Sequence, residues 1–193
     1  MDSATQFALG AVIGAVALGP RIGARKAIII GGLMGTVPDL DTFIPSDDPV
    51  SSFTSHRGAS HSLIIQALVT PLFAEPLVRF FKSLRDHRIR TYLAIYLIFA
   101  THALIDAMTI YGTRLLYPII DTPFGVGSVF IIDPLYSFPL VLIVLWGLVS
   151  SGYSSQLATW AKRALMVSSA YMLLSIPLQQ LAEAKAVRVL EDR

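Results

Sequence analysis

Residues 134–161 of the chain read PLYSFPLVLIVLWGLVSSGYSSQLATWA, and none of these side chains is charged. A helix that crosses the hydrocarbon core of a bilayer needs about 20 largely apolar residues. This stretch meets that requirement by itself, and shorter charge-free stretches precede and follow it along the chain. The pattern indicates an integral membrane protein.

The composition of the whole chain supports this interpretation. Of the 193 residues, 54% are hydrophobic and 15% are charged, whereas about a quarter of the residues in a soluble domain are charged. Such a composition excludes an ordinary soluble domain and a disordered chain. The net charge of +2 does not indicate a nucleic-acid partner, and the lack of cysteine excludes disulfides and thiolate metal ligands.

The apolar stretches predict an all-α, polytopic bundle of about six transmembrane helices. We place them at 4–19, 25–44, 62–81, 91–111, 130–150 and 163–181. Six spans leave no room for a soluble domain, so residues 1–193 are expected to form one integral membrane domain with a short tail at 182–193. The first span is short. The second and third contain polar residues, which predicts tilted, broken or re-entrant helices.

Small residues recur at four-residue intervals in the first two predicted helices. Gly10 and Gly14 lie in the first, and Gly31 and Gly35 in the second. Small side chains at this spacing allow helix backbones to approach closely in lipid. We therefore expect these small residues to serve close packing of helices.

Basic residues predict the orientation in the membrane. Nine of them follow the first, third and fifth spans, and the short loops on the opposite side hold only Arg57 and Arg114. Because Lys and Arg favour the cytoplasmic side, both termini are predicted to be non-cytoplasmic. The expected location is the plasma (inner) membrane, with membrane lipids as partners and no nucleic acid.

Ionisable side chains near the membrane are the candidate functional residues, because their burial in lipid is costly. They fall within 36–136 and toward the predicted non-cytoplasmic face. The candidate metal ligands are Asp39, Asp41, His56, His61, His102, Asp106 and Asp133.

The spacing of these residues suits a shared cation. His102 and Asp106 are four apart, so they project from one face of a helix. Asp39 and Asp41 follow a proline, which suits a helix end or a turn. Imidazole together with carboxylate favours zinc or another divalent transition metal. The set also offers enough ligands for two metal ions.

Each candidate also has a structural explanation. Asp133 precedes a proline and could cap a helix, and Asp106 could bond to a neighbouring helix. Arg57 and Arg114 suit recognition of a phosphate or carboxylate, or contact with a lipid headgroup.

Three motifs, PDLD at 38–41, HRGASHSL at 56–63 and HALIDAMTIYGTRLLYP at 102–118, resemble the YdjM-like inner-membrane proteins of bacteria and archaea. That family is described as predicted membrane-bound metal-dependent hydrolases, and the resemblance runs from about Gly10 to Pro139. It implies that the metal-associated residues are Asp39, Asp41, His56, His61, His102 and Asp106. It also implies that Arg57, Ser60 and Thr109 belong to the surrounding motif.

The leading hypothesis is a hydrolase that depends on zinc, or on manganese or magnesium, and acts on a lipid or lipid-linked phosphoester. Asp39 and Asp41 would be ligands or general bases, and Arg57 or Arg114 would stabilise an anionic group. A second hypothesis is a metal-independent lipid phosphate phosphatase with a histidine nucleophile, although its Lys-x6-Arg-Pro element is absent. An ion or proton transporter and a purely structural membrane protein are also compatible with intramembrane His and Asp residues.

Overall fold

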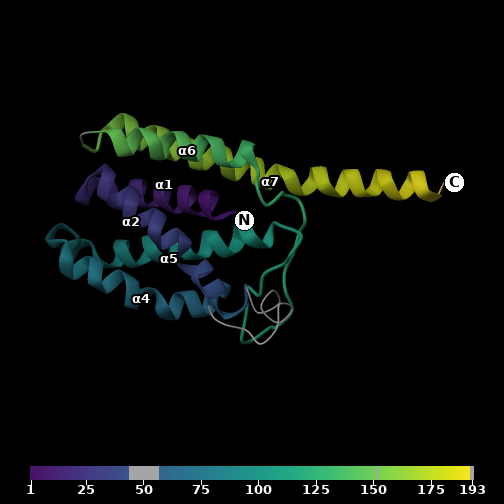
Figure 1. Ribbon diagram of the computed structural model, residues 1–193, viewed down its shortest axis with the longest axis horizontal. Helices are drawn as coiled ribbons and strands as arrows, with labels where there is room; N and C mark the ends of the chain where they lie inside the picture. The colour runs from purple at the N-terminus through teal and green to yellow at the C-terminus, as the bar shows by residue number, and fades with distance from the viewer. Residues whose placement is uncertain (44–56, 151, 192–193) are drawn as a thin grey trace.

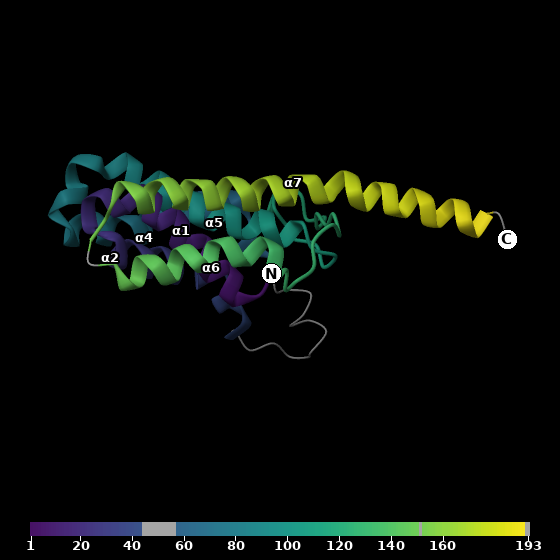
Figure 2. The ribbon, with the colours of Figure 1, turned by 90° about the horizontal axis from the view of Figure 1, so that it is seen from above.

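The computed structural model describes residues 1–43, 57–150 and 152–191, and this part of the chain is a bundle of α-helices with no β-strand. The predicted all-α class is confirmed, and the helices lie roughly side by side (Figure 1; Figure 2). The α-helices are α1 (Ser3–Ile22), α2 (Ala24–Thr36), α4 (Leu63–Phe80), α5 (Arg88–Ala107), α6 (Pro134–Val149) and α7 (Ser155–Glu191).

Four helical segments of the described residues are long and apolar enough to cross a membrane. They are α1, α4, α7 and the segment Lys82–Ala107, which joins the 3-10 helix η3 (Lys82–His87) to α5. The α2 and α6 helices are shorter, at 13 and 16 residues. Large apolar side chains such as Leu68 and Leu72 of α4 are exposed on the outside of the bundle, as suits a surface in contact with lipid.

The close packing predicted from the small residues is confirmed, and the structure shows that α1 and α2 pack against each other through their glycines. A Cβ atom added to Gly14 would lie 2.5 Å from the carbonyl oxygen of Ala27, and one added to Gly35 would lie 2.5 Å from that of Gln6. Both distances are far shorter than van der Waals contact. The two backbones can therefore adopt this spacing only where these positions lack side chains.

The second predicted span is interrupted, as its polar residues suggest. Its α-helix ends at Thr36 and continues as the 3-10 helix η1 (Val37–Phe43). Pro38 explains the change, because proline has no N–H to donate to the carbonyl oxygen four residues earlier. The α5 helix likewise ends at Ala107, four residues earlier than predicted, and the chain then turns at Gly112, where φ is 76°.

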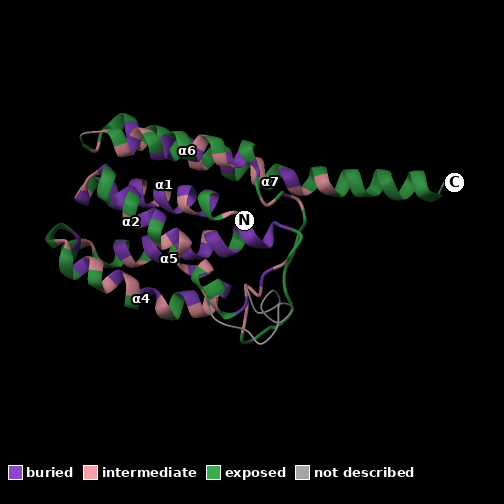
Figure 3. Ribbon diagram, viewed as in Figure 1, coloured by how far each residue is buried: buried purple, intermediate pink, exposed green. Residues whose placement is uncertain are grey.

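The last helix is longer than the predicted span at 163–181. The α7 helix runs from Ser155 to Glu191 and extends well past the other helices (Figure 1; Figure 3). Residues 182–191, expected as a tail, read AEAKAVRVLE. Most of these residues are strong helix formers, and no proline or glycine interrupts them. The helix therefore continues beyond the apolar stretch that defined the prediction.

Replacing Gly14 with Ala should destabilise the bundle, because the new methyl group would collide with the α2 backbone. We expect a loss of about 1–3 kcal/mol in the free energy of unfolding, as for overpacked cores. Unfolding in detergent micelles by titration with SDS would measure it. Gly152→Ala is the matched control, since an added Cβ there meets no described atom within 4 Å. Equal stability of the two variants would contradict the role of the glycine contact.

Candidate metal centre

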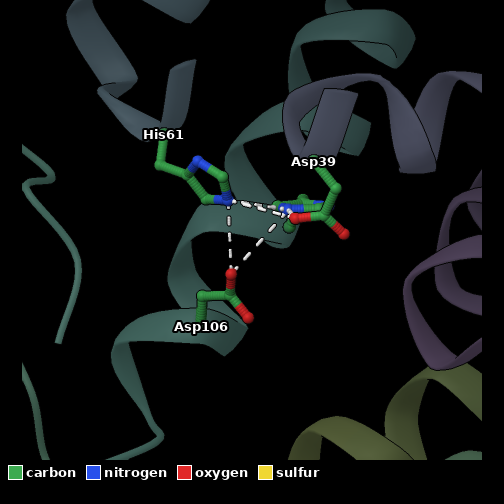
Figure 4. Close-up of side chains that lie close together, drawn as sticks. Asp39, His61 and Asp106 are labelled. Atoms are coloured by element: carbon green, nitrogen blue, oxygen red, sulfur yellow. Dashed lines mark hydrogen bonds and ion pairs between the residues drawn. The ribbon is translucent and has the colours of Figure 1, made fainter. Parts of the chain in front are cut away.

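Four side chains in the described part of the chain converge on one point in the bundle. They are Asp39, His61, His102 and Asp106, and one ligand atom from each lies within 4.8 Å of all the others. Figure 4 shows His61 and Asp106 pointing toward the carboxylate of Asp39. His61, His102 and Asp106 are at most 1% exposed, whereas the side chain of Asp39 is 17% exposed. The group could hold a metal ion.

Local sequence explains how three separate elements supply these residues. His102 and Asp106 lie one turn apart near the end of α5, on the same face of the helix. Asp39 lies in η1, where Pro38 has ended the α-helix. His61 ends the short 3-10 helix η2 (Ala59–His61), just before α4 begins. Its neighbour Ser62 caps α4 and also donates to the carbonyl oxygen of Tyr117, which holds this connection in place.

The distances between the ligand atoms suit a tetrahedral ion. The Nε2 atoms of His61 and His102 lie 3.0 Å apart. Oδ1 of Asp39 lies 3.5 Å from Nε2 of His61 and 3.2 Å from Nε2 of His102. Oδ2 of Asp106 lies 3.3 and 3.8 Å from the same two atoms. Bonds of about 2.0–2.2 Å to zinc place tetrahedral ligands about 3.3–3.6 Å apart.

Hydrogen bonds on the far side of each ring define the nitrogen that faces the centre. Nδ1 of His102 lies 2.7 Å from the carbonyl oxygen of Gly35, to which it can only donate. Nδ1 of His61 lies 2.8 Å from Oγ of Ser60, which in turn donates to Asp41 at 2.5 Å. Since the Ser60 proton is used by Asp41, His61 donates from Nδ1. Both Nε2 lone pairs therefore face the centre, the arrangement typical of metal-ligating histidines.

Burial favours the neutral form of His61. Removal from water lowers the pKa of His61 to about 4, which outweighs the opposite effect of Asp39 and Asp41. The ring is therefore neutral at pH 7, which is the form that binds metal ions.

The two oxygens of Asp106 have different surroundings. Oδ1 accepts from Nε2 of Gln6 at 3.2 Å and contacts the amino group of Met1. Oδ2 is buried and has no hydrogen-bond partner among the described residues, and it faces the two imidazoles. Nε of Arg57 also lies 3.4 Å from this oxygen, as an ion pair. A carboxylate oxygen that makes no hydrogen bond and faces two imidazoles suits coordination of a metal ion.

Sequence reasoning missed Gln6. It is 1% exposed, and its Nε2 also lies within hydrogen-bond distance of the carbonyl oxygen of His102, so it links α1 to two ligands. Its one signal in the sequence is an amide within a largely apolar helix, because a buried amide must find a hydrogen-bond partner.

Of the remaining candidate ligands, Asp41 lies on the far side of the His61 ring and Asp133 lies at the start of α6. Asp41 contacts Ser60 and lies 3.8 Å from Nδ1 of His61, on the side of the ring away from the centre. Asp133 caps α6: its Oδ1 accepts from the N–H of Leu135 and its Oδ2 from the hydroxyl of Tyr171. It is not one of the four converging residues. His56 lies outside the described residues.

The two arginines have different surroundings. Nε of Arg57 lies 3.4 Å from Oδ2 of Asp106, and its Nη1 donates to Thr109 at 3.0 Å. Arg114 instead pairs with Asp121 at 3.2 Å. Of the two predicted cations, Arg57 is the one that the structure places beside the candidate centre.

Comparison with known proteins identifies relatives of the chain. The sequence pattern of the family described as YdjM inner membrane protein matches residues 1–182. The chain is also 26% identical over 153 residues to the "Uncharacterized protein YfhP" of Bacillus subtilis (strain 168). That alignment covers 76% of this chain but 46% of the relative, so it spans a little less than half of the relative's length. No solved structure matches the chain significantly.

Ser60→Ala should weaken metal binding without removing a ligand, because it frees the His61 ring from the partner that orients it. Loss of such an outer hydrogen bond typically reduces metal affinity about 10–100-fold. Titration of the purified protein with zinc against a fluorescent chelator would measure the change. Asp133→Asn is the control, because it keeps a capping residue and lies outside the four-residue group. If this control also loses affinity, or if Ser60→Ala retains it, the assigned roles are wrong.

Proposed function

The chain belongs to the YdjM inner membrane protein family, and from this premise we propose that it is a membrane-embedded, metal-dependent hydrolase. The observation that carries the proposal is the convergence of two imidazole Nε2 atoms and two carboxylates at one buried point. This buried cluster provides the imidazole and carboxylate ligands that hydrolytic metal sites use.

We propose zinc as the metal, held by His61, His102 and Asp106, because three protein ligands leave the fourth tetrahedral position free for water. Two nitrogen ligands and one carboxylate ligand suit zinc better than manganese or magnesium, because the latter two prefer oxygen. When bound, such an ion lowers the pKa of water and polarises the bond to be cleaved. Residues of the chain would act as the general base and bind the anionic group of the substrate.

Asp39 is the proposed general base. It is the most exposed of the four residues, and it lines a cavity of about 290 Å³ between the start of α1 and η1. Thr36 and Thr42 also line this cavity, so its wall is partly polar. A substrate or water molecule in the cavity would meet Asp39 first, and its carboxylate could accept a proton from the attacking water. Asp41 acts through Ser60 as a positioning residue.

Arg57 is the proposed anion-binding residue. Its guanidinium is close to Asp106 and Thr109, and a planar guanidinium can bind two oxygens of a phosphate group. The apolar exterior of the bundle suits contact with the bilayer, from which a lipid-linked substrate would come. These features favour a lipid or lipid-linked phosphoester as substrate. The distribution of basic residues supports a site near the non-cytoplasmic face of the plasma membrane.

The metal content of purified protein tests the proposal. We expect about one zinc ion per wild-type chain by elemental analysis, and at least tenfold less for His102→Ala or Asp106→Asn, each of which removes a ligand. Asp133→Asn is the matched carboxylate-to-amide control, and it should keep its metal.

An activity assay then tests hydrolysis. Purified protein in nanodiscs should release phosphate or a headgroup from phospholipids or isoprenoid phosphates, and a chelator should abolish this until zinc is added back. Absence of metal from folded protein would overturn the proposal. Metal uptake into proteoliposomes without hydrolysis would indicate a transporter instead.

A further inference from the structure

A second, apolar cavity of about 170 Å³ lies next to the candidate centre. Residues close in sequence to three members of the centre line it: Pro38 precedes Asp39, Ser60 precedes His61, and Phe99 lies about one helical turn before His102. The cavity therefore shares its walls with the three elements that hold the centre.

The remaining wall is one face of α4. Ile65, Val69 and Phe73 are spaced four residues apart, so they form a single stripe along the helix, and each is only partly buried. The neighbouring Leu68 and Leu72 are 75% and 72% exposed. The cavity thus lies beside a surface of α4 that suits contact with the hydrocarbon of the bilayer.

A glutamine with a buried amide oxygen lines this apolar cavity. Gln66 lines the cavity and is 2% exposed, and its Nε2 donates to the carbonyl oxygen of Ser60 at 3.0 Å. Its Oε1 is buried with no hydrogen-bond partner in the part of the chain that the structure describes. A buried carbonyl oxygen without a donor is unfavourable, so a ligand that supplies an O–H or N–H would bind better than a plain hydrocarbon.

We propose that this cavity binds the hydrocarbon chain of a lipid, and that Gln66 accepts a hydrogen bond from a hydroxyl or amide N–H near the polar end of that chain. If this hydrocarbon chain belongs to the substrate, as the proposed function implies, the bond to be cleaved lies next to the end that carries the hydroxyl or amide N–H. The occupant comes from the bilayer because the cavity is apolar and adjoins the exposed apolar side of α4. Its size suits part of a single hydrocarbon chain rather than a folded peptide.

Photo-cross-linking of the full chain in nanodiscs tests the proposal. The probes are two phosphate-headed lipids with a diazirine in the middle of the chain, identical except that one has an amide and the other an ester near the headgroup. We expect labelling to concentrate on residues 63–80 around Val69 and Phe73. The amide probe should label about fivefold more strongly, since a hydrogen bond to a buried acceptor contributes about 1 kcal/mol.

Two variants locate the binding. Val69→Trp should fill the cavity and reduce labelling of this region about tenfold. Leu68→Trp is the matched control, because its side chain lies on the exposed surface of the same helix. Gln66→Leu should remove the preference for the amide probe while it preserves labelling by the ester. If Val69→Trp does not fold, as judged by gel filtration, Ile65→Phe provides a milder obstruction.

The outcomes separate this proposal from the proposed function. If a chelator leaves the labelling of α4 unchanged and the protein shows no detectable hydrolysis, the lipid site is supported. The hydrolase proposal fails in that case. Equal labelling of all lipid-facing helices overturns the lipid site even if the protein binds zinc and hydrolyses lipids. Unchanged labelling in a folded Val69→Trp or Ile65→Phe variant also overturns it.

Discussion

Two imidazoles whose Nε2 atoms lie 3.0 Å apart in the interior of the bundle impose the main constraint on this structure. Each ring donates its Nδ1 proton away from the centre, to Gly35 in one case and to Ser60 in the other. Two lone pairs at that distance repel each other unless a positive charge lies between them. The carboxylates of Asp39 and Asp106 would bind the same positive charge, since each places an oxygen within 4 Å of both rings.

Much of the fold and part of the site can be predicted from sequence. The apolar stretches indicate the helices because lipid imposes a strict length and composition on a span. The pair His102 and Asp106 is predictable because one helix fixes their relation. Hydropathy underestimates the length of α7, because its last turns depend on helix propensity and not on hydrophobicity.

The rest of the site depends on tertiary contacts that local spacing does not contain. Asp106 and Asp133 look alike as membrane-proximal carboxylates, yet one faces the imidazoles and the other caps α6. Asp41 differs from Asp39 by two positions in a 3-10 helix, which is enough to place it behind the ring of His61. Gln6 joins the site only because α1 packs against α5.

Gly35 connects two features of this molecule that are otherwise separate. It is the last glycine in the contact between α1 and α2, and its carbonyl oxygen is the acceptor that orients His102. The spacing of the two helices and the orientation of the His102 ring therefore depend on the same residue. A change in the spacing of the two helices would therefore also move the acceptor that orients the His102 ring.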